Sequence, residues 1–201
     1  MSSINTYFQW ESDLQESLLM TDNENRSILE KQLIRYPLNE QAIIKDLKIY
    51  KEFEIQKGLI DLLAVHKTIE KKTEFFDVHI IELKRDGITY RALDQILRYR
   101  EYVQNYFAGW DFTEMLIDKK RLRIFSHLVG TECDWTSDSF YTMMHLQKNY
   151  NIYNHEYYLD PVNGLTFTSY SNCQQTEIEV KECAMDEIVD MCINQFKPDD
   201  N

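Results

Sequence analysis

The sequence predicts a mixed α/β (α+β) domain in which a mixed central β-sheet is flanked by helices. The chain has 201 residues, of which 43% are hydrophobic and 13% aromatic, enough to bury one sizeable core. Short β-rich runs alternate along it with longer segments of helical periodicity. Neither a G-x-G-x-x-G sequence nor a Walker A sequence occurs, so a Rossmann or P-loop nucleotide-binding domain has no support.

The first predicted elements are helical. Residues Ser12 to Met20 are expected to form one helix, and Ser27 to Arg35 a second helix that Pro37 ends. Ser27 and Glu30 have the spacing of a capping box, in which the two residues satisfy each other's backbone N–H groups.

Three strands in succession are expected next. The β-rich runs are Leu47 to Ile55, Leu59 to His66, and Phe75 to Leu83. Residues 56–58 separate the first two runs, and the polar stretch Lys67 to Glu74 separates the last two. We expect that charged stretch to be accommodated as an extended hairpin.

A longer helix is predicted over Thr89 to Phe107, because its apolar residues recur on one side at a period near 3.6. The elements predicted after it are a strand at Arg121 to Leu128, a helix over Asp138 to Lys148, a hairpin over Tyr150 to Tyr170 that turns at residues 160–164, and an acidic helical tail over Thr176 to Phe196.

Composition favours one domain with additions at both ends. Residues 1–26 are expected to be a helical extension, 27–172 the main domain, and 173–201 an acidic tail packed on it, because no Gly-, Ser- or Pro-rich linker intervenes. No stretch approaches the roughly 18 apolar residues of a membrane span, which predicts an intracellular, cytoplasmic protein without a membrane partner. The cysteines lack a C-x-x-C pair, so reduced thiols are expected.

The net charge of −12 argues against nucleic-acid binding, which depends on lysine and arginine. The distribution of charge weakens that objection. Residues 84–123 hold nine basic and six acidic groups and are +3 overall, so the rest of the chain is −15.

The residues most suited to chemistry lie on the second and third predicted strands. Asp61 interrupts an otherwise apolar run, where an unpaired carboxylate would cost several kcal/mol. On the next strand the period of two places Glu82 and Lys84 on one face. Two carboxylates and an ammonium suit metal-dependent phosphodiester hydrolysis, in which carboxylates hold Mg²⁺ or Mn²⁺. The alternative is an edge-strand charge pair and a turn acid.

These residues belong to a series of motifs that resembles the PD-(D/E)xK nucleases, in particular their RecB-like, NucS-type branch. The resemblance covers residues 27–107, about half of the chain. The motifs are Leu29-Glu30-Lys31-Gln32-Leu33, Tyr36-Pro37, Lys51-Glu52-Phe53, Gly58-Leu59-Ile60-Asp61-Leu62-Leu63-Ala64, Ile80-Ile81-Glu82-Leu83-Lys84-Arg85 and Gln95-Ile96-Leu97-Arg98-Tyr99.

The resemblance implies a restriction-endonuclease-like core, and it assigns roles to particular residues. Asp61, Glu82 and the main-chain carbonyl of Leu83 would bind the metal, and Lys84 would be the catalytic lysine. Glu30 either completes the metal site or serves only as the capping-box acid. Residues expected to act on or contact the substrate are Gln95 and Tyr99 of the Q-x-x-x-Y helix and the basic residues Arg85, Arg91 and Arg98.

The sequence departs from the NucS-type pattern at two points. Leu59 stands where that pattern often has an arginine, and only about 26 residues precede the first motif helix, too few for a separate DNA-binding domain. Substrate choice is therefore less constrained than the chemistry, with single-stranded or branched DNA among the substrates considered. A solitary core would suit a phage, plasmid or defence-related protein.

The leading hypothesis is a Mg²⁺- or Mn²⁺-dependent deoxyribonuclease, with endonuclease favoured over exonuclease. The alternative is a catalytically silent module of the same fold that binds a partner or acts as a DNA mimic or inhibitor. The acidic tail, with eight acids and two lysines from Thr176 onward, could bind a protein partner, and a homodimer is a further expectation. The five histidines lack metal-site spacing and are interpreted as satisfied core or surface residues.

Overall fold

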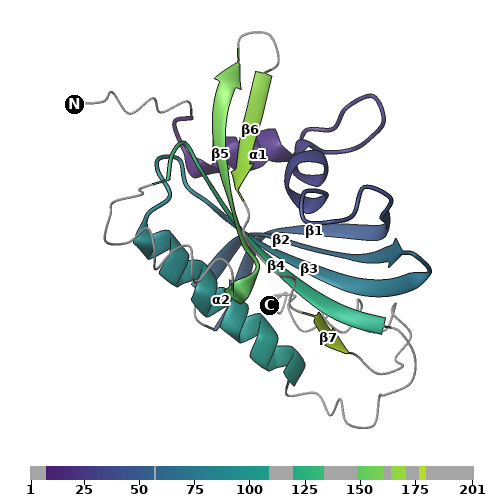
Figure 1. Cartoon of the computed structure of the whole chain (residues 1–201). Helices are drawn as coiled ribbons and strands as arrows, with labels where there is room; N and C mark the ends of the chain where they lie inside the picture. The colour runs from purple at the N-terminus through teal and green to yellow at the C-terminus, as the bar shows by residue number, and fades with distance from the viewer. Residues whose placement is uncertain are drawn as a thin grey trace, which may run out of the picture.

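The computed structural model describes residues 8–56, 58–108, 120–133, 149–160, 164–170 and 177–179. They form a mixed sheet in the order β1-β2-β3-β4-β5-β6, with a short β7 beside β4 (Figure 1). Pairing is antiparallel in β1–β2, β2–β3, β5–β6 and β4–β7, and parallel in β3–β4 and β4–β5. The strands are β1 (Ile43–Ile55), β2 (Gly58–Glu70), β3 (Thr73–Leu83), β4 (Lys120–Gly130), β5 (Ile152–Asp160), β6 (Gly164–Tyr170) and β7 (Glu177–Glu179). The predicted mixed α/β class is confirmed.

The polar stretch between the second and third predicted strands is almost entirely strand. β2 runs to Glu70 and β3 begins at Thr73, and these two residues pair with each other. Only Lys71 and Lys72 remain for the turn, with φ of 46° and 71°. Main-chain pairing satisfies the backbone, while Lys67 and Glu70 are neutralised by Asp46 and Arg123, so charge did not end the strands where the sequence pattern predicted. The expected extended hairpin is confirmed.

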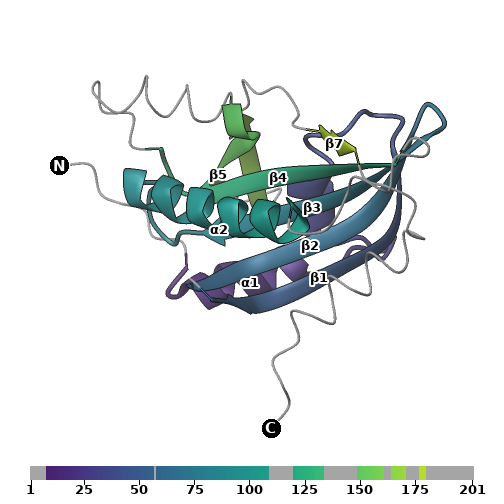
Figure 2. The same cartoon turned by 90° about the horizontal axis from the view of Figure 1, so that it is seen from below.

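Two α-helices cover opposite faces of the sheet (Figures 1 and 2). The helices are α1 (Glu11–Leu19) and α2 (Tyr90–Ala108), and each begins one residue away from its predicted start. Leu93, Ile96 and Val103 of α2 belong to the core on one face, and Leu14 and Leu18 of α1 belong to the core on the other.

The second predicted helix is shorter than expected and is wound differently. After one helical turn it becomes the π-helix Glu30–Ile34, in which the Arg35 N–H donates to the Glu30 carbonyl at 3.0 Å. The Arg35 guanidinium also bonds the Glu30 carboxylate, at 3.2 and 3.3 Å. Five-residue spacing brings these two side chains together, which accounts for the wider turn. The Ser27 hydroxyl accepts the Glu30 N–H at 3.1 Å, so this half of the predicted cap is confirmed.

The predicted tail helix is wrong for residues 177–179, which form β7 and pair antiparallel with residues 121–123 of β4. Glu177-Ile178-Glu179 alternates with a period of two, which is typical of a strand. The rest of that tail, the predicted helix Asp138–Lys148 and the hairpin centre at 161–163 lie outside the described residues.

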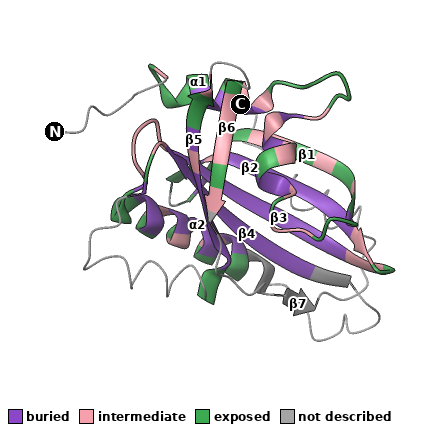
Figure 3. Cartoon of the chain, turned by 45° about the horizontal axis from the view of Figure 1, so that its top comes forward, coloured by how far each residue is buried: buried purple, intermediate pink, exposed green. Residues whose placement is uncertain are grey.

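Burial concentrates in the central strands, where β2, β3 and β4 are covered on both faces (Figure 3). A buried ion cluster lies within this region. The Arg123 guanidinium donates to both Asp77 carboxylate oxygens at 2.7 Å and to Glu70 Oε1 at 2.9 Å, and it stacks 3.9 Å from the Phe75 ring centroid. Within the described ranges no helix is both long and apolar enough to cross a membrane.

Candidate active site

Asp61 lies where the β1–β2 and β2–β3 ladders both break. β1 pairs Lys51 with Leu62 and Phe53 with Ile60, but Glu52, opposite Asp61, has a left-handed φ of 46° and is skipped. Pairing between β2 and β3 ends at Leu62. The Leu83 N–H, freed by this divergence, donates to Asp61 Oδ2 at 2.7 Å. Asp61 is therefore hydrogen-bonded to the end of β3, the strand that carries Glu82.

Glu82 and Lys84 share one face of the end of β3, as the period of two predicts. The Lys84 ammonium donates to Glu82 Oε1 at 2.5 Å. Ile81 and Leu83 point the other way, into the core that includes α1. Glu82 is only 1% exposed, and its second oxygen, Oε2, has no hydrogen-bond partner within the part of the chain that the structure describes. A buried, half-satisfied carboxylate is costly without a further ligand.

Electrostatics at this site disfavour the carboxylate anions. Burial, together with the charge of Asp61, raises the pKa of Glu82 to about 7 despite the neighbouring Lys84. Burial also raises the pKa of Asp61, against the opposing bond from the Leu83 N–H. Burial lowers the pKa of Lys84, but the adjacent Glu82, together with the charges of Glu11 and Asp61, outweighs burial and the net shift is upward. A bound cation would stabilise both carboxylates.

Helix α1 contributes two residues that the sequence analysis missed. Glu11 Oε1 lies 3.9 Å from the Lys84 ammonium and accepts the Arg85 N–H at 3.4 Å. Gln15, one turn later and buried, donates to the Asp61 carbonyl at 2.7 Å. The predicted helix begins at Ser12, one residue after Glu11, so the four-residue spacing that places Glu11 and Gln15 on one face appears only with the observed start.

Glu30, the predicted fourth ligand, is engaged elsewhere. Its carboxylate bonds Arg35, and its charge acts on the pKa of His66. The acids that raise the pKa of Asp61 are instead Glu11 and Glu52. The structure therefore brings Glu11 rather than Glu30 to the site.

Gln95 and Tyr99 are joined on α2 as the motif implies. Gln95 Nε2 donates to the Tyr99 hydroxyl at 2.8 Å. Tyr99 is only 4% exposed and packs against Gly58, where an added Cβ would lie 2.9 Å from its hydroxyl. This contact ties α2 to the start of β2, three residues before Asp61, so Tyr99 acts on the site through packing.

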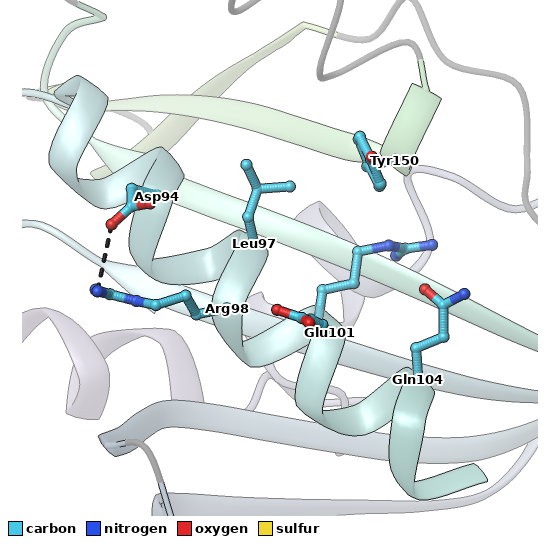
Figure 4. A pocket seen from close by; sticks show the side chains of 7 residues that line it. Asp94, Leu97, Arg98, Glu101, Gln104 and Tyr150 are labelled. Carbon is cyan, nitrogen blue, oxygen red and sulfur yellow. Dashed lines mark ion pairs between the residues drawn. The ribbon is translucent and has the colours of Figure 1, made fainter. Parts of the chain in front are cut away.

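The predicted substrate-contacting arginines are dispersed. Arg85 bonds Asp86 at 3.0 and 3.3 Å and the Gln9 carbonyl at 3.2 Å. Arg91 is exposed on α2. Arg98 pairs with Asp94 at 3.4 Å in a pocket of about 310 Å³ that α2 and Tyr150 line together (Figure 4).

A second pocket, of about 410 Å³, adjoins Lys84 through Glu11. Gln9, Trp10, Glu11 and Ser12 line one part of it, and Arg85 and Asp86 line the other. Trp10 is 61% exposed there, so a large aromatic surface is available beside Glu11. This pocket offers space for a substrate next to Glu11 and Arg85.

The chemical type of the donors at this site suits a hard divalent cation. The available donors are carboxylate oxygens of Asp61 and Glu82, with Glu11 close by, and oxygen ligands are those that Mg²⁺ and Mn²⁺ prefer. The unpartnered Glu82 Oε2 supplies a free coordinating atom.

Comparison with protein-family models, with curated proteins and with solved structures found no match.

Proposed function

We propose that this protein is a Mg²⁺- or Mn²⁺-dependent nuclease of the PD-(D/E)xK type that hydrolyses phosphodiester bonds in DNA. The observation that carries the proposal is the buried Glu82 carboxylate, bonded to Lys84 through one oxygen and unpartnered at the other. Asp61 acts on it electrostatically and is anchored to the same strand end.

The topology supports a restriction-endonuclease-like core. An acid on the second of three antiparallel strands and an E-x-K sequence on the third are followed by a helix and a parallel strand. The resemblance in sequence implies the same order of motifs.

Each residue of the candidate site would have a separate role in hydrolysis. Asp61, Glu82 and the Leu83 carbonyl would hold the cation, and Glu11 would approach from α1. The cation supplies charge stabilisation at the scissile phosphate and lowers the pKa of its water. Lys84 would orient the attacking water or offset developing negative charge. Gln15 fixes the backbone of Asp61, and Leu83 fixes its carboxylate.

Cleavage assays with matched variants test the proposal. Single-stranded, duplex and branched DNA would be incubated with Mg²⁺ or Mn²⁺ and the wild type, Asp61→Asn, Glu82→Gln or Lys84→Met. We expect each substitution to reduce the rate by at least about 10²-fold, because each removes a charged participant in the transition state. Lys45→Met, on an exposed position of β1, is the control and should cut normally. Unchanged rates in the three site variants would overturn the assignment.

The −12 net charge favours one competing function, a silent module that binds a partner. Calorimetric titration with Mn²⁺ distinguishes the nuclease from the silent module, because a module that only binds a partner is not expected to bind a cation at Asp61 and Glu82. We expect the wild type to bind Mn²⁺ and Glu82→Gln to bind it far more weakly.

A further inference from the structure

Four buried histidines form a continuous row across the face of the sheet opposite Glu82. His79 and Glu82 alternate to opposite faces of β3, so the row is separate from the candidate active site. The histidine row consists of His66 on β2, His79 on β3, His127 on β4 and His155 on β5, all fully buried.

Each ring is hydrogen-bonded to the next. The His66–His79, His79–His127 and His127–His155 contacts each join two ring nitrogens at 2.9 Å. The ring centroids are 4.9 to 5.1 Å apart, so the rings meet edge to edge rather than face to face. Ser169 on β6 bonds His155 Nδ1 at 2.7 Å and extends the row to the sheet edge. Side-chain bonds thus cross every strand from β2 to β6.

The Asp77 end determines which nitrogens carry protons. Thr68 donates its hydroxyl hydrogen to Asp77 at 2.5 Å. His66 Nδ1 faces that hydroxyl oxygen at 3.0 Å and the Lys67 carbonyl at 3.3 Å, both of which can only accept from it. His66 Nδ1 is therefore the donor.

The other tautomers follow from that assignment, since a neutral imidazole donates once and accepts once. His66 Nε2 must accept from His79 Nε2. His79 Nδ1 then accepts from His127 Nε2, and His127 Nδ1 accepts from His155 Nε2. Ser169 donates to His155 Nδ1. Every N–H in the row points toward Asp77.

A metal ion does not fit this arrangement, although His66, Asp77 and His79 bring ligand atoms together. Two nitrogens bound to one tetrahedral metal ion lie about 3.3 Å apart at ordinary bond lengths, rather than the observed 2.9 Å. Both Asp77 oxygens are also bonded to Arg123. The contacts have the length of hydrogen bonds.

The charged groups that act on the row lie at its Asp77 end. Burial lowers the pKa of His66, and the charges of Asp77 and Glu30 partly oppose that shift. Arg123 opposes protonation of both His66 and His79. At the other end, Tyr36 is half exposed, packs edge-on against His155 and donates to the Ser169 carbonyl. Protons can therefore enter from Ser169 and are attracted toward Asp77.

We propose that the histidine row is a proton-binding relay that takes up a single proton at its Ser169 end and stores it on His66 beside Asp77. His66 Nδ1 lies 3.8 Å from Asp77 Oδ2, close enough for the carboxylate to stabilise an imidazolium. The proposal is independent of the nuclease function.

Proton transfer along the row keeps the number of hydrogen bonds between the rings unchanged. A proton from a solvent acid binds His155 Nδ1, and the Nε2 protons of His155, His127 and His79 each pass to the next ring. The last of these transfers leaves His66 protonated on both nitrogens. The three other rings end neutral with Nδ1 protonated, and every link now points toward Ser169. A second proton would make two donors face each other and break a link between strands.

Nitrogen NMR of the full chain labelled with ¹⁵N-histidine tests the relay. At pH 8 we expect His66 as the Nδ1–H tautomer and His79, His127 and His155 as Nε2–H tautomers. On acidification these three should convert together to Nδ1–H, with one midpoint, while His66 becomes doubly protonated. One equivalent of Zn²⁺ should change none of these signals.

A matched pair of β6 variants tests the entry point. Ser169→Ala removes the hydroxyl that donates to His155 Nδ1 before proton uptake and accepts its N–H afterwards. We expect the common midpoint to fall, because a buried N–H without an acceptor is the costlier of the two losses. Thr168→Ala, at the exposed neighbouring position, should leave it unchanged.

Several outcomes would overturn the relay. These are a different tautomer pattern at pH 8, four separate midpoints, or Zn²⁺ displacing ring protons. Unfolding that protonates all the rings at once, with no tautomer reversal before it, would also contradict it.

Discussion

Glu82 shows at the scale of one residue how burial prepares a site for a cation. Removing a carboxylate from water raises its pKa, and here the nearby charge of Asp61 adds to the effect of burial. At neutral pH a proton and a metal ion would therefore compete for the same oxygens. Lys84 occupies only one of those oxygens, so a ligand for the other still stabilises the folded site.

This competition predicts how metal affinity depends on pH. Because the pKa of Glu82 is about 7, we expect Mn²⁺ affinity to fall about tenfold per pH unit below 7 and to level off above pH 8. Calorimetric titrations at pH 6, 7 and 8 measure this directly. Affinity that is constant across that range would show that Glu82 is not a ligand.

The buried Arg123 side chain also depends on correctly placed acidic partners. Its planar guanidinium bonds both oxygens of Asp77 and one of Glu70, which a lysine ammonium cannot reproduce. We expect Arg123→Lys to lower the free energy of unfolding by about 2–4 kcal/mol, measured by urea denaturation. Arg91→Lys, on the exposed side of α2, should change it by less than about 0.5 kcal/mol. Similar losses in both variants would contradict this account of the buried cluster.

At the scale of elements, the site depends on how α1, α2 and the β1–β2 hairpin are held together. Gln15 of α1 bonds the backbone of Asp61, and Tyr99 of α2 packs on Gly58 at the start of the same strand. The two helices hold β2 from opposite faces of the sheet, on either side of its candidate metal ligand.

The contact between Tyr99 and Gly58 can be tested with two glycine substitutions. Gly58→Ala would place a Cβ 2.9 Å from the Tyr99 hydroxyl, and we expect it to cost about 1–3 kcal/mol beyond backbone strain. Gly164→Ala is the control, since its φ of 73° is also positive but no atom lies within 4 Å of an added Cβ. Urea denaturation gives both values. Adding Tyr99→Phe to Gly58→Ala should recover part of the loss, and equal losses in the two alanine variants would refute the packing argument.

At the scale of the whole molecule, the two faces of the sheet carry different polar systems. One face presents Glu82 and Lys84 at a strand end, and the other holds the histidine row within the core. The row replaces part of an apolar core with hydrogen-bonded imidazoles. Such a network keeps all its links after one added proton, but each further proton breaks a link and destabilises the fold.

Stability should therefore decline in acid. Burial lowers the pKa of His66, His79 and His127, and it lowers that of His155 to about 3, whereas an unfolded histidine titrates near about 6.5. The unfolded chain thus binds more protons, and stability present above pH 6.5 is lost as pH falls. Each ring that stays neutral in the fold contributes on the order of 1.4 kcal/mol per pH unit.

Glu82 and Asp61 act in the opposite direction, but they are two groups against four rings. The raised pKa of Glu82 contributes stability below about pH 4.5 that is lost as pH rises through about 7, so acidification restores that stability. We expect the urea midpoint to fall from pH 7.5 to 6.0 and further to 5.0. A midpoint that holds or rises over this range would contradict neutral, buried rings.

The sequence by itself determined most of the elements and the central pair of the candidate site. Strand alternation is a local property, so Glu82 and Lys84 could be assigned to one face, with Ile81 and Leu83 on the other, without any tertiary information. Residue spacing likewise placed Gln95 beside Tyr99 on one helix.

Only the tertiary structure decided which groups from distant segments meet these residues. Glu11 reaches the Arg85 backbone across 74 positions of sequence, while Glu30, closer to Asp61 in sequence, bonds Arg35 instead. The histidines look unrelated in the sequence, yet strand register aligns them into one row. Register and helix docking follow from the packing of the whole core, so no local pattern of residues could have specified these contacts.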